Sequence, residues 1–352
     1  MSDDKTATPH SERLERLLNA FSEARAALDA PPAYEWAWTY DGRAEGEEGV
    51  HIGASAIVHG DEVGPLEGLL DVMEALAQGK LSFRGRFTCF LGNPEAARGG
   101  VRFLEDDLNR VFRPLRPEEE AEALPTHEAR RAQALTPLLN SFDVYVDFHQ
   151  TILPVAQPFY ICPWSGESWR WARLMGGAQA WVTRHPERGG GGLACADEWV
   201  RLRGRPSLAL ELGALGFSPE ARAAVWRSLS RAFRAAEELS RVGVFARRDT
   251  LDLIARAQPD LRFYETTARV PLSDPRACLQ PGWINFAEVR EGQLLSPPAA
   301  PVEVRAPASG ALLFPKYPPR DAEGAALPPA PSELLRVVSP LAAHPLDLWG
   351  DL

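Results

Sequence analysis

Four residues of this chain are of types that bind a metal ion or move a proton, and each stands at the end of an apolar run. His59 and Glu62 lie three residues apart in one polar turn, close enough to share one ion. With His149 they make a set of two histidines and one glutamate, and three protein ligands with a fourth place open for water are typical of catalytic zinc. Glu211 is the right kind of group to take a proton from water and return it to a leaving amine.

The elements that must position these residues are buried strands. Apolar runs predict strands over residues 50–58, 87–91, 144–148 and 207–210. Three of these runs end directly before His59, His149 and Glu211, and helical spacing follows the first run from Leu66 to Leu76. Strands that alternate with helices indicate an α/β fold. Ligands of open α/β sheets bind outside the carboxyl ends of the strands, so we expect the polar residues to converge there.

The pattern of the sequence divides the chain into three parts. An amphipathic helical pattern within 11–30 predicts an N-terminal helical extension over 1–45. The alternating strands and helices lie within 46–248, which we expect to form the catalytic domain. Prolines are frequent between residues 297 and 345 among short β-like runs, and we expect 249–352 to form a small β-rich C-terminal domain with long loops.

The composition excludes several classes of protein. The net charge of −10 over 352 residues argues against a nucleic-acid-binding surface, which needs a concentrated basic face, although a few arginines can still hold an anionic small-molecule substrate. We expect no membrane segment, because no run of about 18 apolar residues and no signal-peptide pattern is present. The four cysteines are widely spread, so we expect reduced thiols and a cytoplasmic protein, with assembly into a homo-oligomer left open.

Four sequence blocks surround these residues. They are Val58–Glu62; Gly92–Ala96 with Arg102-Phe103 and Asp107–Phe112; Asp147–His149; and Leu210–Gly213. In order and spacing they resemble the H-G-N-E, G-N-P … R-[YF] … D-[LM]-N-R-x-F, D-L-H and L-E-L-G motifs of the succinylglutamate desuccinylase/aspartoacylase family, within the zinc-carboxypeptidase-like superfamily. The resemblance covers about residues 50–215, and a fainter one extends from Asn285-Phe286 to Phe314-Pro315. It implies an α/β fold with a mixed central sheet flanked by helices and a smaller C-terminal β domain.

The resemblance also implies roles for individual residues. His59, Glu62 and His149 would bind one zinc ion per chain, and Glu211 would be the general base and acid. Arg102 would polarise the scissile carbonyl. The chemistry needs these residue types, because zinc lowers the pKa of bound water toward about 7 and a guanidinium stabilises the oxyanion that forms.

Substrate binding is implied for a second group of residues. Asn109 with Arg110 would hold a substrate carboxylate, and the planar guanidinium of Arg110 fits a carboxylate bidentately in a way that lysine could not. Arg201, ten residues before Glu211, matches in spacing a family arginine that binds a second carboxylate. Arg203 and Arg205 are competing candidates for that position, and a solvated surface arginine is the alternative interpretation of Arg201.

The sequence departs from the family pattern at several positions. Asp61 stands where the family usually has asparagine, which adds negative charge next to the metal. The continuation after His149 differs from the usual H-T-A-x, and Tyr317 is only a loose match to the tyrosine that aspartoacylases supply from the C-terminal domain. Asp147, two residues before His149, either points to the opposite face or acts behind the metal ligands, and we favour a structural role. These departures concern the substrate more than the mechanism.

The leading hypothesis is therefore a zinc-dependent amidohydrolase that deacylates an N-acyl amino acid of the N-succinylglutamate or N-acetylaspartate type. One alternative is a zinc carboxypeptidase-like enzyme that acts on a peptide or another amide. A second alternative is a non-catalytic relative that only binds a ligand. Loss of Glu211 or of a metal ligand would mark that relative, and neither is lost here.

Overall fold

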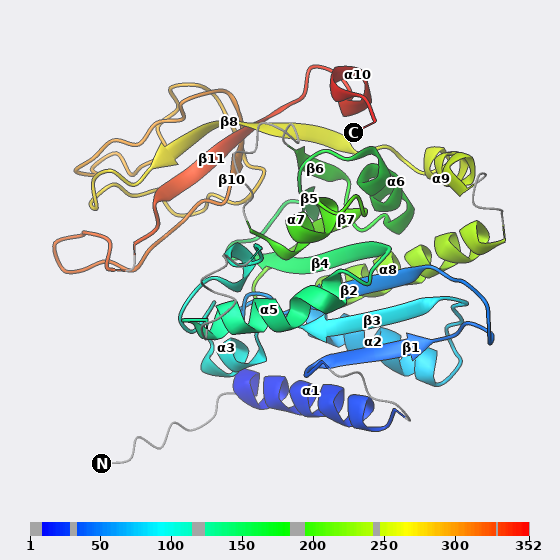
Figure 1. Ribbon diagram of the computed structural model, residues 1–352. Helices are drawn as coiled ribbons and strands as arrows, with labels where there is room; N and C mark the ends of the chain where they lie inside the picture. Colours follow the sequence, from blue (N-terminus) through cyan, green and yellow to red (C-terminus); the bar gives the residue numbers. More distant parts are fainter. Residues whose placement is uncertain are drawn as a thin grey trace, which may run out of the picture.

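A mixed sheet of eleven strands runs through the described part of the protein (Figure 1). The computed structural model describes residues 9–28, 34–114, 124–183, 194–241, 247–328 and 330–351. Across the sheet the strands follow the order β1-β3-β2-β4-β7-β5-β6-β8-β11-β10-β9. They are β1 Ala37–Asp41, β2 His51–Ala56, β3 Arg86–Leu91, β4 Val144–Thr151, β5 Phe159–Ile161, β6 Ala180–Thr183, β7 Ser207–Ala214, β8 Arg262–Pro271, β9 Glu288–Val289, β10 Gly310–Leu313 and β11 Glu333–Pro340.

The centre of the sheet is parallel. Strands β3, β2, β4 and β7 all run in the same direction, whereas β1 is antiparallel to β3 and β5 is antiparallel to β7. Every residue of β2 and of β4 is buried, as expected for parallel strands that helices cover on both faces. Because these strands end at one edge of the sheet, the segments that follow β2, β4 and β7 lie together at that edge.

Helices cover both faces of this parallel centre (Figure 1). On one face α2 packs against α8, which also contacts α6 and α9, while α5 and α7 contact each other on the opposite face. Side-chain hydroxyls of Thr126, Ser165 and Ser218 cap α5, α6 and α8, and so satisfy amide groups at their first turns. The helices are α1 Pro9–Ala26, α2 Pro65–Ala77, α3 Pro94–Gly99, α5 His127–Leu139, α6 Gly166–Met175, α7 Ala196–Arg201, α8 Pro219–Ser240, α9 Arg247–Arg256, α10 Pro345–Trp349 and the 3₁₀ turn η1 Leu108–Arg110.

The C-terminal part of the chain is rich in strands. Strands β8 to β11 enclose a hydrophobic cluster of their own, and β8 pairs both with β11 and with β6, so the sheet continues from the parallel centre into this region. Asn285 joins the two parts, because its side chain donates to the carbonyls of Leu153 and Pro154 and accepts from the amide of Phe314. This contact lies just beyond the carboxyl end of β4.

The predicted fold class is confirmed: the sheet is mixed, helices flank it, and a β-rich region follows. The strand expected over 50–58 ends at Ala56, because Ile57 has a positive φ of 57° that breaks the extended conformation. Strand β1 lies within the segment expected to be a helical extension. Among the described helices, none is long and apolar enough to span a bilayer. The domain boundaries at 45 and 248 stay a prediction.

Candidate active site

The turn that follows β2 is held by close backbone contacts. Ile57 has a φ of 57°, which is strained for a β-branched residue, and the chain leaves the strand direction there. The amide of Asn93 donates to the carbonyl of Ile57 over 2.7 Å. A Cβ on Gly92 would lie only 2.6 Å from the Cα of Val58, so this close approach requires glycine. The contacts with the Gly92-Asn93 turn therefore fix the backbone that carries His59.

His59, Glu62 and His149 come together at the carboxyl edge of the sheet. Nδ1 of His59 lies 2.7 Å from Oε1 of Glu62, and Nδ1 of His149 lies 2.8 Å from Oε2 of the same carboxylate. The two imidazole rings are 5.0 Å apart between centroids. All three side chains are buried, and one ligand atom from each lies within 4.8 Å of the others. The two elements that supply them, the turn after β2 and strand β4, are neighbours because β2 pairs with β4.

The donor set of this cluster fits a divalent cation. The two Nδ1 atoms face the carboxylate of Glu62, and each Nε2 atom faces a second carboxylate: Asp107 lies 3.1 Å from His59 and Asp147 lies 2.8 Å from His149. For His149, a ring hydrogen given to Asp147 through Nε2 leaves a lone pair at Nδ1. A lone pair that faces a carboxylate oxygen at this range needs a cation or a proton between them. Zinc is a suitable cation for such nitrogen and oxygen ligands.

Burial and neighbouring charges together shift the pKa values of the residues in and beside the cluster. Burial opposes a charged ring at His59, but Glu62 and Asp107 outweigh it and raise the pKa of His59. The pKa of His149 is likewise raised against burial, by the neighbouring carboxylates. Burial would raise the pKa of Glu62, yet the two histidines hold it well below its usual range. Burial and then the charge of Glu62 raise the pKa of Asp61, which lies beside the cluster.

Glu211 lies on β7, directly beside His149 in the register of β4 and β7. Burial raises the pKa of Glu211 to about 7, although the charge of His149 opposes the shift. Its Oε2 atom is buried and makes no hydrogen bond to any described residue. A carboxyl group with a pKa near 7 and an unsatisfied oxygen can accept a proton and release it again at neutral pH.

Arg102 borders the cluster. Its Nη1 donates to Oε1 of Glu62 over 3.1 Å, its Nη2 lies 2.7 Å from Nε2 of His59, and its Nε lies 3.4 Å from Asp107. The side chain remains 37% exposed. The backbone carbonyl of Arg102 accepts from the amide of Gly60 over 2.8 Å, which ties this segment to the turn after β2. Arg102 is thus placed between the buried carboxylates and solvent.

Asn109 and Arg110 lie in the 3₁₀ turn η1, beside the start of α7. Nδ2 of Asn109 lies 3.4 Å from Nε2 of His149, and Oδ1 of Asn109 accepts from the amide of Ala196 over 2.9 Å. Arg110 is exposed, and its Nη1 donates to the carbonyl of Asn109 and lies 3.2 Å from Sγ of Cys195. Asn109 therefore touches the cluster, whereas the guanidinium of Arg110 is held at its margin.

Arg201 does not contact the cluster in the described structure. It lies on α7 and makes two hydrogen bonds of 3.1 and 2.9 Å to Glu198 on the same helix. The two competing arginines have other partners, since Arg203 stacks on Trp199 at 3.4 Å and Arg205 pairs with an aspartate at the amino end of β4. A role for Arg201 at a second substrate carboxylate stays a prediction.

Tyr317 is engaged within the C-terminal region. Its hydroxyl donates to the carbonyl of Gln280 over 2.9 Å and accepts from the amide of Trp283 over 3.1 Å. The ring is 38% exposed. These bonds explain the position of the tyrosine without any contact to the cluster.

Sequence reasoning gave no role to Asp107 or Gln150, and for Asp147 it favoured a structural role over a place behind the metal ligands. The spacing held one usable signal, because alternate residues of a strand share a face and Asp147 must therefore lie on the same face as His149. Gln150 contacts the turn after β2 in two ways. Its backbone amide donates to Glu62 over 3.0 Å, and its side-chain oxygen accepts from the backbone amide of Gly64. No feature of the sequence predicts this side-chain contact.

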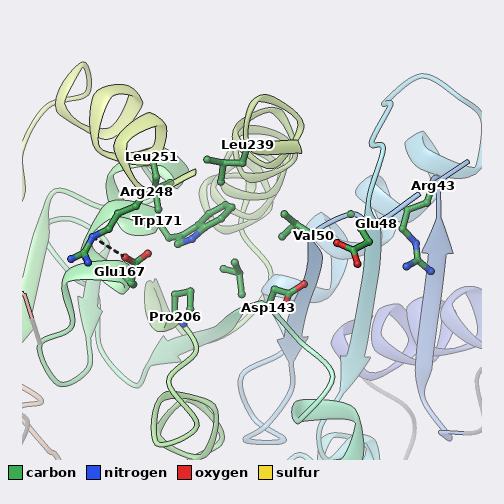
Figure 2. Close-up of a pocket in the computed structure, with 12 residues that line it drawn as sticks. Arg43, Glu48, Val50, Asp143, Glu167, Trp171, Pro206, Leu239, Arg248 and Leu251 are labelled. Carbon is green, nitrogen blue, oxygen red and sulfur yellow. Dashed lines mark ion pairs between the residues drawn. The ribbon is translucent and has the colours of Figure 1, made fainter. Parts of the chain in front are cut away.

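A cavity of about 540 Å³ lies at the opposite edge of the sheet. Figure 2 shows Trp171 and Leu239 over its centre, with the ion pair between Glu167 and Arg248 at one side. Val50 and Asp143, which precede β2 and β4, also line it, so the cavity belongs to the amino ends of these strands. It is therefore separate from the cluster at their carboxyl ends.

Comparison with known families matches residues 49–236 to the succinylglutamate desuccinylase/aspartoacylase catalytic domain. The chain belongs to this family. A succinylglutamate desuccinylase of Burkholderia pseudomallei is 33% identical over a 188-residue alignment, and the match covers 46% of this chain and 53% of that protein. This chain thus spans about half the length of the curated relatives that it matches.

Solved structures of the family share the fold. The succinylglutamate desuccinylase of Chromobacterium violaceum superposes with a TM-score of 0.63 at 19% identity, and covers 96% of this chain and 99% of its own. A succinylglutamate desuccinylase/aspartoacylase of Rhodobacter sphaeroides gives a TM-score of 0.60 at 18% identity, with 84% and 87% covered. The likeness extends beyond the matched catalytic region into the C-terminal strands.

Proposed function

We propose that this family member is a zinc-dependent amidohydrolase that removes the acyl group from an N-acyl amino acid of the N-succinylglutamate or N-acetylaspartate type. The observation that carries the proposal is the buried cluster of His59, Glu62 and His149 directly beside Glu211. Family membership and the names of the relatives support an amide substrate with an amino acid on one side.

His59, Glu62 and His149 would hold the zinc ion. When bound there, zinc supplies Lewis acidity, which makes a water molecule a nucleophile at neutral pH and polarises a carbonyl group. Asp107 faces the outer nitrogen of His59, and Asp147 faces that of His149. These contacts keep the inner nitrogens of both rings directed at Glu62. Unsatisfied buried oxygens on Glu211 and Asp61 show that polar groups of this site lack partners among the described residues.

Glu211 would move the proton. Burial raises its pKa to about 7, so its carboxylate can take a proton from the attacking water and its acid can give that proton to the leaving amine. Its neighbour His149 opposes the rise in pKa, which keeps part of the population ionised near neutral pH. Because β7 lies beside β4, the backbone register holds the carboxyl group at this place, although no described residue makes a hydrogen bond to its Oε2 atom.

The arginines would bind the negative groups of the substrate. Arg102 is part exposed and borders the cluster, so its guanidinium can reach a substrate carbonyl and stabilise the oxyanion that develops on it. Arg110, with Asn109, would hold a carboxylate of the amino acid or acyl group, and Arg201 would bind a second one. The net charge of −10 gives an anionic substrate no long-range attraction, so the attraction must come from these local cations.

A hydrolysis screen tests the proposal. N-acyl amino acids with varied acyl groups and amino acids are incubated with chelator-treated protein before and after zinc is restored, and release of the free amino acid is measured. We expect release from at least one N-acyl amino acid with zinc and none without it. Release of C-terminal residues from peptides, with N-acyl amino acids left intact, would contradict the proposal and favour the carboxypeptidase-like alternative.

Glu211→Gln tests the proton transfer separately. The variant keeps a side chain of the same shape but cannot accept a proton, so we expect turnover to fall about 10²- to 10⁴-fold. Zinc content, measured by atomic absorption, should be unchanged. Loss of zinc in this variant would show that Glu211 is a ligand, and a rate within about tenfold of the wild type would show that another group moves the proton.

A further inference from the structure

Tyr145, Ser55 and Asp147 form a continuous buried chain behind His149. The hydroxyl of Tyr145 lies 2.6 Å from Oγ of Ser55, and Oγ of Ser55 donates to Oδ1 of Asp147 over 2.6 Å. All three residues have no exposed surface. We call them the Tyr145–Ser55–Asp147 chain.

The backbone register brings this chain together. Ser55 on β2 pairs directly with Asp147 on β4. Tyr145, Asp147 and His149 alternate along β4 and therefore lie on one face of the strand. The chain thus starts in the hydrophobic layer, where the Tyr145 ring stacks with Phe90 and Phe142, and ends at the cluster of His59, Glu62 and His149.

The direction of the hydrogen bonds follows from the number of hydrogens. Ser55 has a single hydroxyl hydrogen, and an ionised carboxylate can only accept, so this hydrogen goes to Asp147. Tyr145 must therefore donate to Ser55. Burial and the charge of Asp147 raise the pKa of Tyr145 well above its usual value, which keeps its hydroxyl hydrogen in place. Oδ1 of Asp147 is thus held by hydrogen bonds that are all donated in one direction, from Tyr145 to Ser55 and from Ser55 to Asp147.

The other oxygen of Asp147 faces His149. Oδ2 makes no hydrogen bond of regular geometry to the described residues, and Nε2 of His149 lies 2.8 Å away. On the far side of the same ring, Nδ1 lies 2.8 Å from Glu62. Oδ2 of Asp147 lies closer to Nε2 of His149 than Nδ2 of Asn109 does, at 2.8 against 3.4 Å, and an Nε2–H directed at Oδ2 leaves the Nδ1 lone pair facing Glu62.

Burial of Asp147 is unfavourable for folding alone. A fully buried carboxylate costs several kcal/mol of desolvation, and apolar residues of similar volume often serve stability better. Aromatic rings pack against the Tyr145 end of the chain, where an apolar side chain would fit. The polar chain is therefore better explained by what it does to His149 than by what it adds to the core.

We propose that Tyr145, Ser55 and Asp147 are positioning residues that orient His149 and thereby set the affinity of the cluster for its metal ion. This inference rests on the metal-binding part of the proposed function and not on any particular substrate. Groups that orient a metal-binding histidine typically change metal affinity about 10- to 100-fold when they are removed. The effect should decrease along the chain, from Asp147 through Ser55 to Tyr145.

The test measures zinc affinity of the full chain by competition with a chromophoric chelator. We expect Asp147→Asn to weaken zinc binding about 10- to 100-fold, Ser55→Ala by up to about tenfold, and Tyr145→Phe by less than Ser55→Ala. Tyr145→Phe keeps the stacked ring, and so it changes only the hydroxyl group. Cobalt supplies a second readout, because its visible spectrum reports a change in ligand orientation without any substrate.

Ser207→Ala is the matched control. Ser207 is buried on the neighbouring strand β7, beside Tyr145 in the register of β4 and β7. Its hydroxyl donates over 2.7 Å to the backbone carbonyl of Asp197 and not to a side chain of the Tyr145–Ser55–Asp147 chain. We expect this variant to lose stability without loss of zinc affinity. Equal zinc affinity in Ser55→Ala, Asp147→Asn and the wild type, or an equal loss in Ser207→Ala, would overturn the inference.

The outcome is independent of hydrolysis. If the zinc affinities follow the expected order but no N-acyl amino acid is cleaved, the positioning role stands and the substrate proposal fails. If cleavage is found and the zinc affinities do not change, the substrate proposal stands and the positioning role fails. Thermal unfolding of the metal-free proteins shows whether a variant is folded, so a general loss of structure is distinguished from a loss of orientation.

Discussion

The residues of the cluster are placed by two kinds of contact. Glu62 lies between two imidazole nitrogens, and carboxylates border the outer nitrogen of each ring. Such an arrangement keeps a buried carboxylate ionised against the cost of burial, because two positively charged or metal-bound rings face it. The site therefore concentrates charge in a place from which water is largely removed, where electrostatic interactions are strong.

Arg110→Ala tests whether this residue binds a substrate carboxylate. Removal of the guanidinium leaves a partly desolvated substrate charge without its partner, which typically costs about 2–5 kcal/mol. We expect kcat/KM to fall strongly for acids and much less for the matching amides or esters. Arg113→Ala, an exposed neighbour, should affect neither. Equal losses for acids and neutral analogues would assign Arg110 to support of the η1 turn.

His51 predicts a pH dependence of stability. Burial, followed by the charge of Arg86, lowers the pKa of His51 to about 4, and the charges of Asp143 and Arg43 also face it. In the unfolded chain its pKa is about 6.5. The folded chain binds fewer protons between these values, so stability is lost as the pH falls through this window. From pH 7 to pH 5 this contribution should fall by about 2 kcal/mol.

The measurement compares urea unfolding of the wild type and His51→Gln at the two pH values. Other groups titrate in both proteins, so the difference between their pH dependences isolates the histidine. The wild type should lose more stability on acidification than the variant. Parallel curves would mean that the pKa of the ring is the same in the folded and the unfolded chain, and that its burial and its contacts with Ser141 and Thr88 do not lower it.

At the scale of the elements, the turns after the parallel strands decide the site. The turn after β2 depends on strain at Ile57 and on the missing side chain of Gly92, and the Gln150 side chain binds that turn to the end of β7. Strained backbone persists only where its surroundings determine it, and it is often found at functional sites. The strands place the site at one edge of the sheet, and the turns determine the positions of its side chains.

Gly92→Ala tests this dependence on close approach. The added Cβ would lie 2.6 Å from the Cα of Val58, which forces the two turns apart. We expect a loss of about 1–3 kcal/mol in stability, as for other overpacked sites, together with weaker zinc binding. Gly99→Ala is the control, because its Cβ would meet only a side-chain carbon at 3.4 Å. An unchanged zinc affinity in Gly92→Ala would show that the close approach of the two turns does not affect metal binding by the cluster.

At the scale of the whole molecule, the β-rich C-terminal region is connected to the active-site edge. Asn285 is buried and hydrogen-bonds to the segment that follows β4 and to the segment after β10. Strand β8 also extends the central sheet into this region. The C-terminal strands are therefore part of the frame that holds the carboxyl end of β4.

Asn285→Ala tests this connection. The substitution leaves the carbonyl of Leu153 and the amide of Phe314 without their buried partner, which typically costs about 1–3 kcal/mol. We expect a corresponding loss in the free energy of unfolding in urea. Gln293→Ala removes an exposed amide of the same region and should change stability by less than about 0.5 kcal/mol. Equal effects of the two variants would show that the connection contributes nothing.

The sequence by itself determined four central strands, the residues at their ends and the family. Apolar runs that end in polar residues are local patterns, and the blocks around His59, His149 and Glu211 are contiguous in the chain. The convergence of those residues followed from a general property of parallel sheets. Each of these conclusions needs only neighbouring residues or a rule of topology.

Only the tertiary structure decided the partners of the side chains. The pairing of Ser55 with Asp147 depends on the register between two strands, and the hydrogen bonds of Arg201 with Glu198 depend on which rotamer its surroundings allow. Register and rotamers are set by packing between segments far apart in the chain, which leaves no local pattern in the sequence. For that reason the chain predicts the residue types of its site, and the folded molecule determines which of their atoms meet.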